Sequence, residues 1–204
     1  MTTIVRAVLC CLLLAPIPGC QKVPQVSPLP ADGVILAFGD SITFGTGANE
    51  AESYPALLEK MCGRRVVNAG LPGEVSRDGV QRLAELLDRD KPALVILCHG
   101  GNDLLQKLDQ AALAENLRSM IRLAREKGIP VVLLAVPAPD LSLKPPGLYA
   151  EVAAEFDLPI EMKSLAKILG KGSLKSDYIH PNAAGYRLLA ENVLQFLTKC
   201  GAIP

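Results

Sequence analysis

The sequence predicts an α/β fold of three layers, in which helices cover both faces of a mainly parallel sheet of five strands. Four apolar runs in the chain do not alternate with polar residues, which is typical of strands that are buried on both faces. These runs are residues 34–38, 66–69, 93–98 and 129–136. Segments with helical periodicity separate the runs, and alternation of strands and helices through short connections favours parallel pairing with right-handed crossovers.

Each long helix is predicted from apolar residues that recur at the three- and four-residue spacing of one helix face. The pattern occurs in four segments, which are residues 54–61, 80–87, 113–124 and 186–197. Gly128 and Pro130 follow the third segment and end that helix. Residues 152–168 are predicted to hold a further helix and a short fifth strand at residues 158–160. We expect a single domain that spans residues 33–204.

Residues 1–19 predict a signal peptide. Arg6 precedes a stretch without charges, residues 7–15, which is too short to cross a bilayer as a helix but fits a secretory signal. The segment that ends in Cys20 resembles the lipobox of bacterial lipoproteins, in which the cysteine becomes acylated, although Pro18 stands where a small residue is usual. Export to the bacterial cell envelope or periplasm follows, either as a lipoprotein anchored in the membrane through Cys20 or as a soluble protein after plain cleavage.

The proline-rich residues 20–32 predict an extended tether rather than a packed element. Three cysteines lie beyond this tether. Cys98 ends an apolar run and is predicted to be buried, whereas Cys62 and Cys200 each lie near the end of a helical pattern. In an oxidising compartment Cys62 and Cys200 could form a disulfide, a hypothesis that a count of free thiols tests.

Composition and charge exclude several classes of function. With 21 basic and 21 acidic residues and no Trp, the chain lacks the positive surface and the aromatic rings of a nucleic-acid binder. None of the cysteines or histidines has the spacing of a zinc site, and no CxxC or HExxH motif occurs. We therefore expect no nucleic acid as partner, and neither a metal nor another cofactor.

Candidate reactive groups follow three of the predicted strands. In an open parallel sheet such groups gather in the loops after the carboxyl ends of strands. The first three runs are followed, in turn, by Gly39-Asp40-Ser41, Asn68-Ala69-Gly70 and Gly100-Gly101-Asn102-Asp103. Each motif taken alone is explained by a turn or a helix cap. Only their combination with Asp177 and His180, which precede the last helix, favours a reactive site.

Acyl transfer requires a hydroxyl nucleophile, an imidazole base, a carboxylate that orients the base, and donors that face the developing oxyanion. Ser41 offers the hydroxyl and a backbone N–H at the start of a helix. His180 offers the imidazole, and Asp177 precedes it by three residues, so one turn of chain can bring the carboxylate to the ring. Gly70 can present a backbone N–H, and Asn102 can add a side-chain amide. We expect these five residues to form one site.

These motifs resemble those of the SGNH hydrolase superfamily, the GDSL esterases and lipases. They occur in the family's order across nearly the whole mature chain, as Gly39-Asp40-Ser41-Ile42, Gly70, Gly101-Asn102-Asp103, and Asp177 with His180. Ile42 stands in place of the Leu that gives GDSL its name. The likeness is greatest to the small bacterial branch of arylesterases, thioesterases and lysophospholipases, and it implies a flavodoxin-like sheet. It also implies that Ser41 is the nucleophile, His180 the base and Asp177 its partner, with Ser41, Gly70 and Asn102 as the oxyanion donors.

The expected function is hydrolysis of carboxylic esters through an acyl-enzyme, with short to medium acyl esters, aryl esters or lysophospholipids as substrates. Removal of acetyl groups from envelope or extracellular glycans is the alternative within catalysis, because the same groups could perform it. A third hypothesis is a non-catalytic lipoprotein that binds a glycan or lipid, although such a protein has no need of a nucleophile matched to a base. The other histidine, His99, has no carboxylate at short spacing and is predicted to be a structural imidazole.

Overall fold

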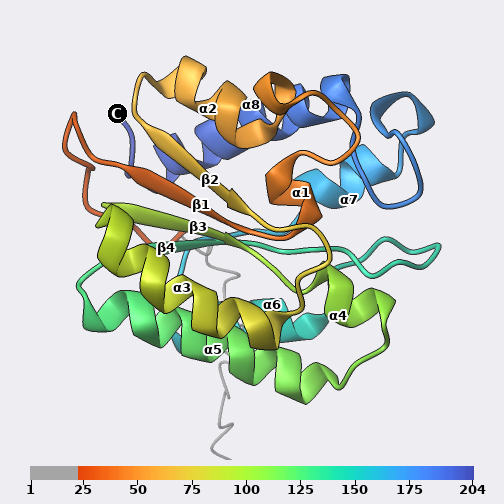
Figure 1. The fold of residues 1–204 in the computed structure, drawn as a ribbon, viewed down its shortest axis with the longest axis horizontal. Helices are drawn as coiled ribbons and strands as arrows, with labels where there is room; N and C mark the ends of the chain where they lie inside the picture. Colours follow the sequence, from red (N-terminus) through yellow and green to blue (C-terminus); the bar gives the residue numbers. More distant parts are fainter. Residues whose placement is uncertain (1–22) are drawn as a thin grey trace, which may run out of the picture.

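Five parallel strands form one sheet in the order β2-β1-β3-β4-β5, and helices cover both of its faces (Figure 1). The structure is a computed structural model that describes residues 23–204. The strands are β1 (Ile35–Gly39), β2 (Val66–Gly70), β3 (Leu94–Cys98), β4 (Val131–Leu134) and β5 (Ile160–Glu161). The predicted three-layer α/β fold with a parallel, five-stranded sheet is confirmed.

The central strands β1, β3 and β4 are buried along their whole length, as the unbroken apolar runs predict. Full burial of each Val, Leu or Ile side chain contributes about 1.5 to 3 kcal/mol. β1 lies in register between β2 and β3, so Gly39 at its carboxyl end lies beside Gly70 and Cys98. The loops that follow these three strands therefore start together at one edge of the sheet.

Helices α1, α2, α7 and α8 lie on one face of the sheet, and α3, α5 and α6 lie on the other (Figure 1). The longer helices are α2 (Tyr54–Cys62), α3 (Ser76–Asp90), α5 (Gln110–Glu126), α6 (Gly147–Glu155) and α8 (Ala183–Lys199). The short ones are α1 (Ser41–Phe44), α4 (Gly101–Leu105) and α7 (Ser164–Leu169), with 3-10 turns at Glu50–Glu52 and Gly172–Leu174. The four amphipathic patterns in the sequence lie within α2, α3, α5 and α8.

Two helices, α1 and α4, are too short for hydrophobic periodicity to predict, although the motif at Ser41 did indicate the start of a helix. α1 has four residues and α4 has five, which is less than the window in which a helical period can be recognised. Each follows directly on a central strand, α1 after β1 and α4 after β3. Both helices begin at the edge of the sheet where the strands end, so they place the residues that follow β1 and β3 next to each other.

Part of the predicted tether packs with the domain. Val26 and Leu29 are buried, and their N–H groups donate to the carbonyl oxygens of Cys200 and Ala202 at 2.7 and 2.9 Å. These backbone hydrogen bonds join the segment to the C-terminal end of the chain, so the packed domain begins near Val26 and not at residue 33. The predicted signal peptide and the lipidation site lie outside the described residues. Between residues 23 and 204, no helix has both the length and the apolar character that crossing a bilayer requires.

The structure contradicts the hypothesis of a disulfide. Cys62, Cys98 and Cys200 are all free thiols in the described part of the chain. The Sγ atom of Cys200 lies 3.4 Å from the carbonyl oxygen of Leu197, and that of Cys62 lies 3.8 Å from the carbonyl oxygen of Arg64. Each sulfur thus contacts the backbone beside its own helix. Cys98 is buried, as its apolar run predicts.

Candidate active site

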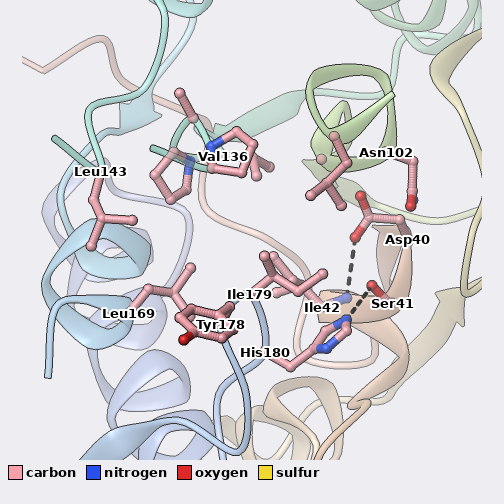
Figure 2. Close-up of a pocket in the computed structure, with 15 residues that line it drawn as sticks. Asp40, Ser41, Ile42, Asn102, Val136, Leu143, Leu169, Tyr178, Ile179 and His180 are labelled. Atoms are coloured by element: carbon pink, nitrogen blue, oxygen red, sulfur yellow. Dashed lines mark hydrogen bonds between the residues drawn. The ribbon is translucent and has the colours of Figure 1, made fainter. Parts of the chain in front are cut away.

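Ser41 is the first residue of α1 and follows the carboxyl end of β1 by two positions. The residue between them, Asp40, is buried and caps the helix by accepting the N–H of Ile42 at 3.1 Å (Figure 2). Burial raises the pKa of Asp40, and the nearby His99 and His180 act in the opposite direction. The first N–H groups of α1 have no acceptor within their own helix, so the N–H of Ser41 is available to a bound group.

His180 and Asp177 lie on the loop that precedes α8. The Nε2 atom of His180 is 2.9 Å from Ser41 Oγ (Figure 2), and its Nδ1 atom is 2.8 Å from Asp177 Oδ2. The other carboxylate oxygen, Oδ1, accepts the N–H groups of Ile179 and His180, each at 2.8 Å. The three-residue spacing therefore forms a tight turn, in which one carboxylate binds both the backbone and the ring of His180.

Hydrogen bonds keep Asp177 ionised. Burial would raise the pKa of Asp177, but the hydrogen bonds from the His180 ring and from the two N–H groups lower that pKa below its ordinary value. The ionised carboxylate accepts the Nδ1–H of His180, which leaves Nε2 with a lone pair toward Ser41 Oγ. The arrangement can thus remove a proton from the serine hydroxyl.

Asn102, in α4, lines the same cavity as Ser41 and His180 (Figure 2). Its Nδ2 atom donates one hydrogen to the carbonyl oxygen of Glu74 at 2.9 Å. Because an amide nitrogen carries two hydrogens, the second is free for another acceptor. The structure therefore brings Asn102 together with the Ser41, His180 and Asp177 side chains, although these residues come from three separate parts of the chain.

The structure does not bring Gly70 into this cavity. Gly70 is the last residue of β2, and its N–H already donates to Asn68 Oδ1 at 3.0 Å. A Cβ atom at this position would lie 2.0 Å from the backbone nitrogen of Phe44, so only glycine allows α1 to pack this closely on β2. The geometry contradicts the expected role of Gly70 as an oxyanion donor. The lack of a side chain at Gly70 lets α1 pack on β2, and its N–H already donates to Asn68.

A turn directly after β2 contains a backbone donor that the sequence analysis missed. The N–H of Glu74 donates to the carbonyl oxygen of Leu71 at 3.2 Å, and Pro72 and Gly73 occupy the two central positions. A φ angle of 83° at Gly73 identifies a type II turn, in which the N–H of this residue makes no bond within the turn. The carbonyl oxygen of Glu74 binds Asn102, so the turn lies against the site. The Pro-Gly pair was the sequence signal for this turn.

His99 is buried, and both of its ring nitrogens have hydrogen-bond partners. Its Nδ1 atom accepts the N–H of Gly100 at 3.1 Å, so the proton of the neutral ring is on Nε2. The Nε2 atom is 3.0 Å from the carboxylate of Glu74, which also binds the guanidinium of Arg82. The partner carboxylate lies 25 residues earlier in the chain, which is why short spacing could not reveal it.

An apolar cavity leads away from Ser41 and His180, and Figure 2 shows Leu143 and Leu169 at the end opposite Ser41. Its walls come from the segment after β4, from α7 and from the loop that holds His180. The apolar lining includes Val136, Pro137, Pro139, Leu143, Leu169 and Ile179. The reacting groups therefore lie at one end of a hydrophobic channel.

Residues 37–188 match the GDSL-like Lipase/Acylhydrolase family. The chain is 35% identical to esterase TesA of Pseudomonas aeruginosa over 187 residues, which cover 86% of this chain and 92% of that protein. It is 27% identical over 169 residues to thioesterase 1/protease 1/lysophospholipase L1 of Escherichia coli, with 79% of this chain and 81% of that protein covered. Among solved structures, the SGNH-hydrolase family esterase AlinE4 is 31% identical, with a TM-score of 0.64 and coverage of 82% of this chain and 96% of the other. The chain therefore belongs to the GDSL-like lipase/acylhydrolase family of SGNH hydrolases and is a serine esterase or lipase that hydrolyses carboxylic esters.

Proposed function

We propose that this enzyme hydrolyses esters through an acyl-enzyme on Ser41, with His180 as the general base and Asp177 as its partner. The observation that supports this most strongly is the unbroken chain of hydrogen bonds between the three side chains. The distances are 2.9 Å from Ser41 Oγ to His180 Nε2 and 2.8 Å from His180 Nδ1 to Asp177 Oδ2. The distance from Ser41 Oγ to His180 Nε2 lies within the reach of a general base, and the distance from His180 Nδ1 to Asp177 Oδ2 is that of a hydrogen bond which orients the ring.

In the first step, His180 Nε2 takes the hydroxyl proton while Ser41 Oγ attacks the ester carbonyl carbon. The bond to the leaving oxygen then breaks, and His180 gives the proton to the departing alcohol. Water next gives a proton to His180 as its oxygen attacks the acyl-enzyme. The bond to Ser41 Oγ breaks, the proton returns to this oxygen, and the carboxylic acid leaves. Asp177 stabilises the imidazolium in each half of the reaction without taking up the proton.

We assign the oxyanion donors to the N–H of Ser41, the amide of Asn102 and the N–H of Gly73. Gly73 takes the place that Gly70 had in the sequence-based expectation. It lies in the turn whose next residue, Glu74, binds Asn102, so this turn and α4 meet beside the nucleophile. Donors of this kind stabilise the transition state because the negative charge on oxygen develops only there, and loss of one typically costs about 2.7 to 4 kcal/mol.

The substrates are esters with an apolar acyl or aryl group, including medium-chain acyl esters and lysophospholipids. The hydrophobic channel beside Ser41 supports this class, because it offers apolar surface to a chain attached to the carbonyl carbon. Exposed large hydrophobic side chains support it as well. In the described part of the chain there are six, and all lie on segments that follow β1 to β4 or on the loop of His180: Phe44, Leu71, Leu105, Leu108, Leu141 and Tyr178. Two of them, Leu105 and Tyr178, line the cavity itself, which favours an apolar substrate.

A series of nitrophenyl esters from acetate to decanoate tests the substrate class. We expect kcat/KM to rise with chain length until the channel is filled, by roughly fourfold for each methylene that becomes buried. Leu169→Ala should reduce the gain for the longer esters, whereas Leu123→Ala, which alters a partly buried side chain of α5 outside the cavity lining, should leave the series unchanged. Fastest hydrolysis of acetate, with no gain for longer chains, would contradict this class and favour removal of acetyl groups from glycans.

We also propose that the protein is exported and anchored through an acylated Cys20. The first buried residue of the described chain that packs on the domain is Val26, six positions later, and six residues span at most roughly 20 Å. An acyl anchor would hold the domain near a membrane that contains ester lipids. Cys20→Ala should abolish incorporation of labelled palmitate and release the protein from the membrane fraction, whereas Cys62→Ala should change neither. Unchanged labelling of the Cys20→Ala variant would refute the anchor.

A further inference from the structure

Glu74, Arg82 and His99 form a largely buried cluster next to the site, in which Arg82 is partly exposed, and the reaction steps assign none of the three a role. The Glu74 side chain is 3% exposed and that of His99 is 0% exposed. Arg82 Nε and Nη2 donate to the two carboxylate oxygens of Glu74 at 2.6 and 2.5 Å, and His99 Nε2 lies 3.0 Å from Oε2. Burial acts to raise the pKa of Glu74, but the hydrogen bonds from Arg82 and His99 and the charge of Arg82 lower it overall. The cluster therefore holds an ionised carboxylate inside the protein.

Arg82 connects this carboxylate to the ends of two strands. It lies on α3, and its Nη2 and Nη1 atoms donate to the carbonyl oxygens of Gly39 and Ala69 at 3.2 and 3.0 Å. Its guanidinium also lies over the ring of Phe38, with 4.3 Å between Cζ and the ring centroid. Because Gly39 and Ala69 lie at the carboxyl ends of β1 and β2, Arg82 fixes Glu74 relative to the strand that leads to Ser41.

Glu74 and His99 extend the cluster to the loop of Asn102. The backbone carbonyl oxygen of Glu74 accepts a hydrogen bond from the Asn102 amide at 2.9 Å. Because the Glu74 side chain is held in the cluster, its backbone holds the orientation of Asn102. His99 precedes the same loop, where its Nδ1 accepts the N–H of Gly100 at 3.1 Å and its carbonyl oxygen accepts the hydroxyl of Tyr149 at 2.9 Å. A displacement of Glu74 would therefore move the Asn102 amide.

We propose that Glu74 and Arg82, supported by His99, are positioning residues that aim the Asn102 amide at the oxyanion. The inference rests on the proposed function, because it takes Asn102 as an oxyanion donor. Donors that are aimed before the reaction need no reorganisation in the transition state. A misplacement of 1 Å can lower a rate by about 100-fold. Since the oxyanion is absent from the bound substrate, loss of this alignment lowers kcat and changes KM little.

Glu74→Gln perturbs the cluster with almost no change in side-chain volume. The two carboxylate oxygens of Glu74 accept hydrogen bonds from three N–H groups, two of Arg82 and one of His99, and each oxygen accepts at least one. Glutamine has only one acceptor oxygen, so its NH₂ group must face at least one of these donors. His99 cannot relieve this by moving its proton to Nδ1, because Nδ1 accepts the N–H of Gly100. The side chain of the variant must therefore shift, and the Asn102 contact shifts with it.

The test is a double-mutant cycle between Glu74→Gln and Asn102→Ala, with kcat and KM measured on a soluble nitrophenyl ester. We expect Asn102→Ala to lower kcat by about 10²- to 10³-fold. Glu74→Gln should lower kcat by about 10- to 100-fold and change KM by less than about threefold. In the Asn102→Ala background, Glu74→Gln should lower kcat by less than about threefold, because the donor through which it acts is gone.

Arg118→Gln is the matched control, because Arg118 forms an ion pair with Glu155 at 2.7 Å between α5 and α6, away from the cavity lining. This variant should keep the kcat of the unmodified enzyme. An unchanged kcat in Glu74→Gln, or an equal loss in both backgrounds, overturns the positioning role. An unchanged kcat in Asn102→Ala overturns instead the oxyanion assignment of the proposed function. If Glu74→Gln does not fold, Arg82→Lys, which keeps the charge but loses the forked pair of donors, takes its place with the same criteria.

Discussion

Ser41→Ala is expected to lower kcat for a nitrophenyl ester by about 10⁶-fold, the size of loss seen when the nucleophile of a serine hydrolase is removed. The reason is that, among residues 23–204, Ser41 supplies the hydroxyl that contacts His180 Nε2, at 2.9 Å, and the variant loses it. The residual rate reflects the binding of substrate and the oxyanion donors alone. Intact mass after treatment with a serine-directed phosphonate gives a second measurement, and the variant should show no covalent adduct.

Ser27→Ala is the control for this experiment, since Ser27 is exposed and does not line the cavity. It should react with the phosphonate as fast as the unmodified protein. Because Ser41 and His180 act as a unit, adding His180→Ala to Ser41→Ala should cause little further loss of kcat. A burst of one nitrophenol per molecule from Ser41→Ala would show that the acyl group is carried by a different residue.

Asp177→Asn should lower kcat by about 10⁴-fold near neutral pH, as expected when an imidazole is held in the wrong tautomer. Asp177 Oδ1 accepts the N–H groups of Ile179 and His180, so the single oxygen of an asparagine keeps these bonds. The amide NH₂ then faces His180 Nδ1 and donates to it. The ring proton moves to Nε2, where it faces Ser41 Oγ, and the hydroxyl proton has no acceptor.

Asp140→Asn provides a matched control, because Asp140 also accepts the N–H groups of the residues two and three positions later but has no imidazole partner. It should retain most of the activity. The pH dependence follows from the lowered pKa of Asp177. This carboxylate stays ionised above that lowered pKa, so mild acidification should leave Asp177 charged and its hydrogen bond to the His180 ring in place. A rate for Asp177→Asn within tenfold of the unmodified enzyme would contradict the role of Asp177.

Much of the site could be predicted from the sequence because its parts depend on local patterns. The strand before Ser41 is an unbroken apolar run, and strands of this kind end at the edge where reactive loops gather. Asp177 and His180 are three residues apart, so their contact needs only one turn of chain. Asn102 follows a second apolar run in the same way. For these residues, the position along the chain already implies the position in space.

The role of Gly70, in contrast, could not be predicted from a local pattern. A glycine after a strand can serve as a donor or make room for a neighbour, and the residue type does not distinguish the two. The close packing of Phe44 against Gly70 favours the second role, and the N–H that we assign to the oxyanion lies three residues further on, at Gly73. The residues that hold Asn102 could not be identified from the sequence either. Glu74, Arg82 and His99 come into contact only when α3 packs against the sheet.

The sequence by itself determined the layers of this protein, the order of strands and helices along the chain, and the chemical groups that acyl transfer requires. Those properties follow from hydrophobic periodicity and from spacing within a few residues, which are encoded locally. Only the tertiary structure decided which glycine has a free N–H, that Val26 and Leu29 pack on the domain, and that three cysteines stay unpaired. Each of these depends on contacts between distant segments, and such contacts are set by how the whole core packs.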